Sequence, residues 1–461
     1  MKTENVSRTV LAAGAGAVLA ATALLYVPEF AGQGPPPPGP AERATIAAHA
    51  GAQAALPDLA ALITDREKWL RAHPDDEASW AELGAAYTER GSRVGDVRDY
   101  PRAERALRRS LAERPAARGN LEAQLGLGAL AGARGDWKTA EEWGERVRKA
   151  DPRRWAVYPV LMDAYNGLGK YEAARKAMES LEGLHAGAVV RARAAQTYRD
   201  RGWREDADAA ALDAAALAET DTEKAAALAR LGDLAWERGE AEEALGRFGA
   251  ALRLVRDHGP SFAGRARALA ALGRTDEAVR EWRAALVRLP LPEYLLEAGE
   301  LYESLGLDGN ARALYERLRA GTWTGAEVAL GLLDADHGEP AAAVVRMRAE
   351  WARGHRSVRV ADALGWALHR SGASKEALGY AKIATEEGLR SALFAYHRGE
   401  IERALEQTGP ARRHLAEALR INPEFSPLHA RRAEVSLAAL GELPDGPPPE
   451  LRTKPAPPRR N

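Results

Sequence analysis

The sequence predicts an all-α fold, a solenoid of about ten helix pairs stacked in one array. The first observation is a period, because alanine recurs at ten positions spaced 32 to 37 residues apart. The second is a glycine five residues before eight consecutive members of that series, although only 43 of the 461 residues are glycine. The third is composition, since abundant alanine, arginine, leucine and glutamate with 6% aromatic residues favour helices.

Each mark of this period has a structural reason. A glycine suits the left-handed residue that ends the first helix of a pair. A small residue twelve positions before the alanine, such as Gly232 or Gly299, would face that alanine where two antiparallel helices approach most closely. Prolines twelve positions after it, such as Pro115 and Pro423, would end the second helix. The alanines are Ala103, Ala140, Ala174, Ala207, Ala244, Ala278, Ala311, Ala343, Ala377 and Ala411, and the glycines are Gly135, Gly169, Gly202, Gly239, Gly273, Gly306, Gly338 and Gly372.

These marks resemble the tetratricopeptide repeat (TPR). Residues 80–91, WAELGAAYTERG, follow the pattern W-x2-L-G-x2-Y, and Ala103 and Pro115 continue it after about seven inserted residues at the turn. The resemblance covers about residues 60–425 and implies a right-handed α-solenoid of about ten TPR-like helix pairs. The sequence departs from the pattern where Glu406 replaces a turn glycine, and where Arg191 and Glu327 stand at the usual tryptophan position.

From residue 29 onward the sequence predicts three parts. Residues 55–440 form the solenoid with capping helices at both ends, the last of them from Ser426 to Ala439. Residues 29–54 are a proline-rich spacer and lead-in. Residues 441–461, with their many prolines, are expected to be a disordered tail.

Residues 1–28 predict a membrane anchor or a signal peptide. Lys2 and Arg8 precede an uncharged run from Thr9 to Tyr26, which as a helix would rise about 27 Å at 1.5 Å per residue. Basic residues before the run place the amino terminus inside and the rest outside. A small-x-small site at Ala21–Ala23 would allow cleavage instead. An apolar start of a cytosolic protein is the third possibility.

The overall charge and the absence of cysteine exclude several classes of function. Lys and Arg number 65 against 66 Asp and Glu, and a formal charge of −1 argues against bulk electrostatic binding of nucleic acid. Without cysteine there is no disulfide framework, thiol nucleophile or cysteine-ligated metal. The histidines form no pair at metal-ligand spacing, and no phosphate loop or nucleophile elbow occurs. We therefore predict no cofactor, no metal and no catalysis; the alternative is an enzyme whose active site is hidden in the solenoid.

The arginine-rich stretch 346–359 allows two interpretations. It could bind an anionic partner, or acidic neighbours such as Asp334 and Asp336 could balance its charge.

Binding is the remaining route to function. In TPR proteins the first helix of each unit lines the concave surface, chiefly just after the small residue and one turn further on. This resemblance nominates a partner-binding groove, in which Trp236 and Trp366 either anchor a partner segment or pack between repeats. The candidate groove residues are Asp163, Asn166, Gln196, Arg199, Asp233, Trp236, Glu300, Glu303, Trp366, His369 and Tyr396.

The prediction for the whole chain is an exported scaffold in the cell envelope that binds a protein or peptide partner and is tethered to the membrane if its start is not cleaved. One alternative is an envelope maturation chaperone, because residues 62–91 are similar to the TPR part of bacterial cytochrome c assembly factors. Another is a cytosolic TPR signalling scaffold.

Overall fold

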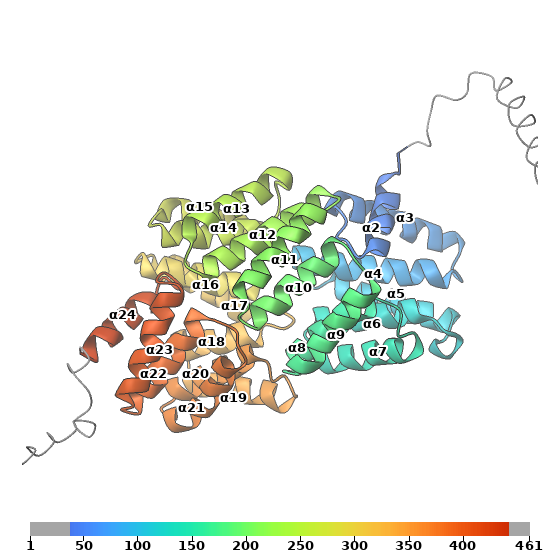
Figure 1. The fold of residues 1–461 in the computed structure, drawn as a ribbon. Helices are drawn as coiled ribbons and strands as arrows, with labels where there is room; N and C mark the ends of the chain where they lie inside the picture. Colours follow the sequence, from blue (N-terminus) through green and yellow to red (C-terminus); the bar gives the residue numbers. More distant parts are fainter. Residues whose placement is uncertain (1–36, 442–461) are drawn as a thin grey trace, which may run out of the picture.

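The computed structural model describes residues 37–441, and these residues form an all-α repeat fold (Figure 1). They contain 23 α-helices, a single 3-10 turn at Ala116–Arg118 and no strand. The predicted anchor or signal at 1–28, the spacer as far as residue 36 and the tail after 441 lie outside the described residues. Within 37–441 no helix combines the length and the apolar character needed to span a bilayer.

The helices of the first half are α2 (Pro40–Ala50), α3 (Leu56–Ala72), α4 (Glu77–Val94), α5 (Asp99–Glu113), α6 (Leu121–Ala133), α7 (Trp137–Ala150), α8 (Val157–Gly167), α9 (Tyr171–Leu184), α10 (Ala188–Asp200), α11 (Arg204–Leu217), α12 (Asp221–Glu237) and α13 (Ala241–Leu254). Those of the second half are α14 (Gly259–Ala271), α15 (Thr275–Arg288), α16 (Pro292–Ser304), α17 (Asp308–Ala320), α18 (Glu327–His337), α19 (Pro340–Ala352), α20 (Val358–Arg370), α21 (Ser374–Glu386), α22 (Ala392–Ala404), α23 (Thr408–Ile421) and α24 (His429–Ala439).

Ten helix pairs run from α4–α5 to α22–α23, as the period predicts. The ten alanines of the series are all buried, none of them more than 4% exposed. The small residues face the second helix of their own pair: a Cβ on Gly299 would lie 2.3 Å from the Tyr315 ring, and one on Gly365 would lie 3.2 Å from the Ala377 carbonyl oxygen. Larger residues at these positions would therefore force the two helices apart.

The turn glycines mostly have the predicted left-handed conformation. Seven of the eight have φ between 70° and 89°, and the exception is Gly338, whose φ is −150°. Glu406, which replaces the glycine in the last pair, takes φ 58° and is the one residue other than glycine with positive φ among the described residues. The turn thus keeps its geometry at Glu406, although a residue with a Cβ is strained in the left-handed region.

The ends of the array differ in detail from the prediction. The lead-in contains a helix, α2, which begins at Pro40, a residue suited to the first turn because it needs no N–H partner there. The final helix begins at His429, three residues later than expected, because the Ser426 hydroxyl accepts hydrogen bonds from the Leu428 and His429 amides in a turn that precedes the helix.

The array winds into a superhelix whose successive coils touch. The Val358 amide donates a hydrogen bond of 2.7 Å to the Tyr171 hydroxyl, 187 residues away, and Asn422 Nδ2 donates one of 2.8 Å to the Trp236 carbonyl, 186 residues away. Such separations correspond to between five and six repeats. In Figure 1 the orange helices α18–α20 accordingly lie beside the green α8–α10.

The coil-to-coil contacts use the turn glycines of the first half. A Cβ on Gly169 would lie 2.3 Å from the Arg356 carbonyl oxygen, and one on Gly202 would lie 2.4 Å from the Gly388 carbonyl oxygen. A Cβ on Gly273, by contrast, would meet nothing within 4 Å. Glycine therefore serves at 169 and 202 both the left-handed turn and the close approach of a neighbouring coil.

Candidate functional site

Two adjoining cavities lie inside the superhelix. The smaller has a volume of about 730 Å³ and the larger about 1080 Å³. They have seven lining residues in common, among them Gln196, Arg199, Arg230 and Arg359. We call the two cavities together the lumen. Its size suits a peptide segment or a bulky organic ligand.

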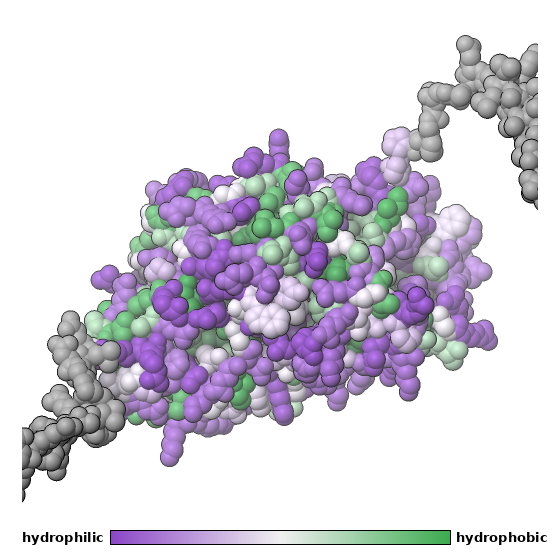
Figure 2. Space-filling model, viewed as in Figure 1, coloured by the Kyte–Doolittle hydropathy of each residue, from purple (hydrophilic) through white to green (hydrophobic). Residues whose placement is uncertain are grey.

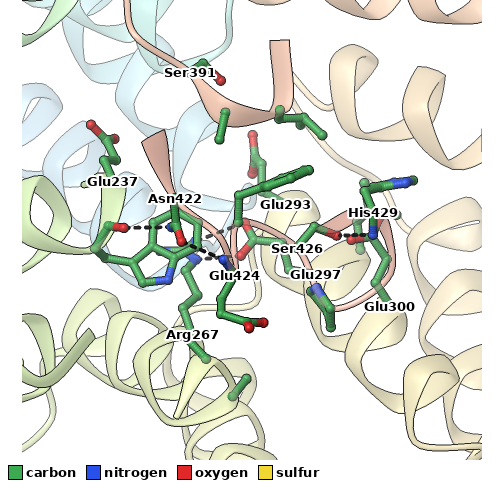
Figure 3. Close-up of a pocket in the computed structure, with 18 of the residues that line it drawn as sticks. Glu237, Arg267, Glu293, Glu297, Glu300, Ser391, Asn422, Glu424, Ser426 and His429 are labelled. Atoms are coloured by element: carbon green, nitrogen blue, oxygen red, sulfur yellow. Dashed lines mark hydrogen bonds and ion pairs between the residues drawn. The ribbon is translucent and has the colours of Figure 1, made fainter. Parts of the chain in front are cut away.

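The lumen is built by the first helices of the pairs and closed by the end of the array. Helices α10, α12, α14, α16, α18 and α20 present one face to it. The segment from Asn422 to His429, which joins α23 to α24, reaches in from the opposite side (Figure 3). Because these helices come from both coils of the superhelix, the lumen exists only while the coil-to-coil contacts hold.

The lining of the lumen is acidic although the whole chain is nearly neutral. Each cavity is lined by eight Asp or Glu residues, and since Glu293 is common to both, the lumen has fifteen. Five arginines line the smaller cavity and four line the larger one. Three of them are common to both, so the lumen has six arginines, and no lysine lines either cavity. The formal charge of −1 is therefore distributed unevenly between the interior and the rest of the chain.

An ion pair occupies the junction of the two cavities. Arg199 Nε lies 2.9 Å from both carboxylate oxygens of Glu237, and its Nη1 lies 2.8 Å from Asp200. Burial alone would raise the pKa of Glu237, but the charge and hydrogen bonds of Arg199 hold that pKa below its ordinary value. Arg199 is thus already neutralised by two carboxylates of its own chain.

A second pair links neighbouring repeats. Arg267 donates to both oxygens of Glu297 at 2.5 and 2.9 Å, and its guanidinium lies 5.7 Å from the centroid of the Trp236 ring. Asp233, 4.0 Å from Arg267, is held less well, and burial raises the pKa of this carboxyl above its ordinary value. These pairs fix the shape of the lumen wall between α12, α14 and α16.

Glu300 lies where the lumen is most acidic. Its carboxylate has no hydrogen bond or ion pair within residues 37–441. Burial raises the pKa of Glu300 well above its ordinary value, and the negative charges of Asp336 and Glu297 add to the rise. We call Glu297, Glu300, Asp336 and Asp362, with His397 and His429, the acidic end of the lumen.

The two histidines of the acidic end are buried, His397 being 1% and His429 3% exposed. Nδ1 of His397 lies 2.9 and 3.0 Å from the two oxygens of Asp362, so it carries the proton that this carboxylate accepts. Burial lowers the pKa of His429 to about 3, which keeps its ring neutral at physiological pH. Nε2 of His397 and Nδ1 of His429 have no hydrogen-bond partner among the described residues.

Seven of the eleven predicted groove residues line the lumen. They are the members that follow the small residue, or stand one turn after it, on α8, α10, α12 and α16: Asp163, Asn166, Gln196, Arg199, Asp233, Trp236 and Glu300. Several of them engage residues of this chain, as Asp163 does with Arg193 at 2.5 Å.

The other four predicted residues do not face the lumen. Trp366 and Tyr396 are 2% and 3% exposed, so the role of Trp366 as an exposed anchor is wrong and the alternative, packing between repeats, is confirmed for it. The Trp366 ring stacks on His397 at 4.1 Å, and its Nε1 donates to Asp336 at 2.9 Å. The physical reason is that the segment before α24 and α24 itself cover this end of the concave face.

Glu303 and His369 are held by neighbours in the same way. Glu303 accepts a hydrogen bond of 3.0 Å from the Tyr315 hydroxyl and lies 3.1 Å from His337. His369 Nδ1 lies 3.0 Å from the Ser374 hydroxyl. Both side chains thus join the two helices of their own pair instead of lining the lumen.

The sequence prediction missed several lumen residues. Arg267 stands immediately after Ala266, the small position twelve before Ala278, so the same spacing would have found it. His429 and Asn422 lie in the joining segment or at the start of α24, where the period has ended. No sequence signal places them inside.

The arginine-rich stretch is balanced by acidic neighbours for the most part. Arg346 pairs with Glu327 at 3.1 Å and with Asp334 at 3.4 Å. Arg348 pairs with Glu376 at 2.8 Å. Within 37–441 no group of three or more metal-binding side chains comes together.

Comparison with protein-family models gives no match, and neither does comparison with curated proteins. Among solved structures, the Cut9–Hcn1 hetero-tetramer of the APC/C is similar over 84% of this chain and 82% of its own, with 13% identity and a TM-score of 0.42. A human IFIT1 dimer with PPP-AAAA is similar over 77% of this chain and 87% of its own, with 12% identity and a TM-score of 0.45. A tetratricopeptide repeat protein from Parabacteroides merdae is similar over 55% of this chain and 98% of its own, with 18% identity and a TM-score of 0.33. At these values the likeness concerns the helical fold alone.

Proposed function

We propose that this chain is a non-catalytic scaffold that binds a protein or peptide partner inside its lumen. The observation that carries the proposal is a concave, charged interior with cavities of about 730 and 1080 Å³, lined by corresponding faces of successive repeats. A segment of a partner lying there would meet one repeat after another, which is how a solenoid adds affinity along its length.

The face of the molecule seen in Figure 2 favours the interior as the binding region. On the face shown in Figure 2, hydrophilic side chains dominate and apolar ones occur in small separate patches. Protein-binding surfaces are usually recognised by larger continuous apolar patches. The charged groups of the lumen wall, Arg199 with Glu237 and Arg267 with Glu297, pair with each other, which suits a binding wall more than a set of reactive groups.

The chemistry of the lumen speaks against nucleic acid as its occupant. Binding of nucleic acid depends on lysine and arginine contacts to phosphates. Fifteen carboxylates against six arginines would repel a phosphate backbone. A protein or peptide partner is therefore the proposal that the charges favour.

A photo-cross-linking experiment tests the lumen as the binding region. A photoreactive residue replaces Gln196, which lines both cavities, and in a matched protein it replaces Lys176, which is exposed on the outer helix α9. We expect one partner to be captured from Gln196 and not from Lys176 when intact cells are irradiated. Capture from Lys176 alone would place binding outside and contradict the proposal.

We further propose that the chain is exported and held in the cell envelope. The support is the uncharged run from Thr9 to Tyr26 behind Lys2 and Arg8. A reporter that is active only outside the cytosol, fused after Asn461, is expected to be active, and its activity is expected to be lost when Leu11 and Leu19 are changed to arginine. If a second reporter, which works only in the cytosol, is active at the same fusion site, export is refuted and the lumen proposal is unaffected.

A further inference from the structure

We infer that the partner segment in the lumen is cationic, and that one of its arginine side chains binds at the acidic end beside Glu300. This inference rests on the proposed function and adds the chemistry of the partner to it. Its grounds are the excess of carboxylates in the lining, the absence of any partner for Glu300 among residues 37–441, and the unpartnered polar atoms of the acidic end.

The carboxylates of the acidic end differ in how far they are satisfied. Glu297 is occupied by Arg267. Asp336 accepts from Trp366 Nε1 through Oδ2, while its Oδ1 lies 3.4 Å from Arg370 and has no hydrogen bond among the described residues. Glu300 has no such partner among the described residues. A carboxylate ion accepts up to about four hydrogen bonds, so Glu300 offers its full capacity to an incoming donor.

The buried histidines are a second and independent sign of a donor-bearing ligand. Nδ1 of His397 is engaged by Asp362, and the other ring nitrogen, Nε2, has no hydrogen-bond partner among residues 37–441. Nδ1 of His429, in a ring that is also more than nine-tenths buried, has none either. A buried polar atom without a partner costs free energy, which a ligand that supplies hydrogen bonds would recover.

A guanidinium group carries the donors and the charge that the acidic end lacks. It carries five N–H donors in a planar fork and never loses its charge in the physiological range. Its positive charge would also relieve the repulsion that Asp336 and Glu297 exert on Glu300. Arg432 is the one cation among the groups that act most strongly on Glu300, and its charge does not offset that repulsion.

The inference is tested by peptide binding to the full chain. The probe is a short fluorescein-labelled peptide of alternating arginine and serine, compared with the same peptide carrying citrulline, or glutamate, in place of arginine. The variant is Glu300→Gln, which removes the charge and keeps the shape. The matched control is Glu316→Gln, the same change on the exposed face of α17.

We expect the arginine peptide to bind the wild-type chain, and citrulline or Glu300→Gln to weaken binding about tenfold or more, with Glu316→Gln within about twofold of wild type. Equal affinity of the two variants for the arginine peptide would overturn the inference, as would tighter binding of the glutamate peptide to the wild-type chain. Circular dichroism of Glu300→Gln is expected to match wild type, so that lost binding does not reflect lost folding.

Two further outcomes separate this inference from the function on which it rests. If a neutral or acidic peptide cross-links at Gln196 and the arginine peptide does not, the lumen binds a partner but the cationic chemistry is wrong. If the arginine peptide binds more tightly after Arg452, Lys454, Arg459 and Arg460 are all changed to glutamine, the chain's own terminus competes for the lumen, and an external partner is no longer supported.

Discussion

Replacing Gly169 by alanine tests whether the superhelical coils are held together by close backbone contact. Gly169 has φ +71°, and a Cβ there would lie 2.3 Å from the carbonyl oxygen of Arg356. Gly273 occupies the same turn position with φ +70° and has open space where its Cβ would stand. The two substitutions therefore differ in the coil-to-coil contact and in little else.

The magnitude follows from the two geometries. Both variants pay about 1–2 kcal/mol for a left-handed alanine, a cost that cancels in the comparison. Gly169→Ala must also move the Arg356 carbonyl away by about 1 Å, and overpacking of this kind costs about 1–3 kcal/mol. Loss of the nearby hydrogen bond from the Val358 amide to Tyr171 would add about 0.5–1.5 kcal/mol.

We therefore expect Gly169→Ala to lose about 1.5–4.5 kcal/mol more stability than Gly273→Ala. The assay is urea denaturation followed by far-ultraviolet circular dichroism on the full chain, with amide hydrogen exchange at Val358 as the local readout. Equal losses in the two variants, with unchanged exchange at Val358, would refute the coil-to-coil contact as a source of stability.

Three further predictions concern single side chains. Tyr171→Phe leaves the buried Val358 amide without its partner across the coils, and it is expected to cost about 1–3 kcal/mol and to speed exchange of that amide while helicity is retained. Glu300→Gln is expected to raise the melting temperature at neutral pH. Because the pKa of Glu300 is higher folded than unfolded, its ionised form costs stability at high pH, and the gain should vanish as the pH falls below the ordinary value of 4.5; a gain that persists in acid would contradict this. The pKa of His429 is lowered from 6.5 to about 3, so wild-type stability is expected to fall as the pH drops through that window, by up to about 1.4 kcal/mol per pH unit. His429→Gln should flatten this part of the dependence of melting temperature on pH.

The fold was predictable because the repeat marks act locally. Ala103 and Gly299 are small for a reason that involves a single helix pair, and a turn glycine such as Gly273 needs its conformation whatever lies around it. Local requirements of this kind are visible in the period of a sequence. Even Glu406 keeps the turn, since the helices on either side of it, α22 and α23, determine the backbone there.

The closure of the lumen was not predictable in the same way. The contact between Gly169 and Arg356 depends on small rotations added up over more than five repeats, and no single repeat records that sum. Seven of the predicted residues, on α8 to α16, therefore line the lumen, whereas Trp366 is buried where the end of the array folds over the concave face. A residue such as His429, beyond the last repeat, enters the lumen without any pattern to announce it.

The coil-to-coil contacts also restrict how this chain can change its length. In an open solenoid one repeat can be gained or lost with an effect on its immediate neighbours alone. Here Tyr171 meets Val358 and Trp236 meets Asn422 at separations of 187 and 186 residues. Deleting one repeat of about 34 residues between them would bring every later loop against the wrong partner. The number of repeats per coil therefore cannot change without the loss of these contacts.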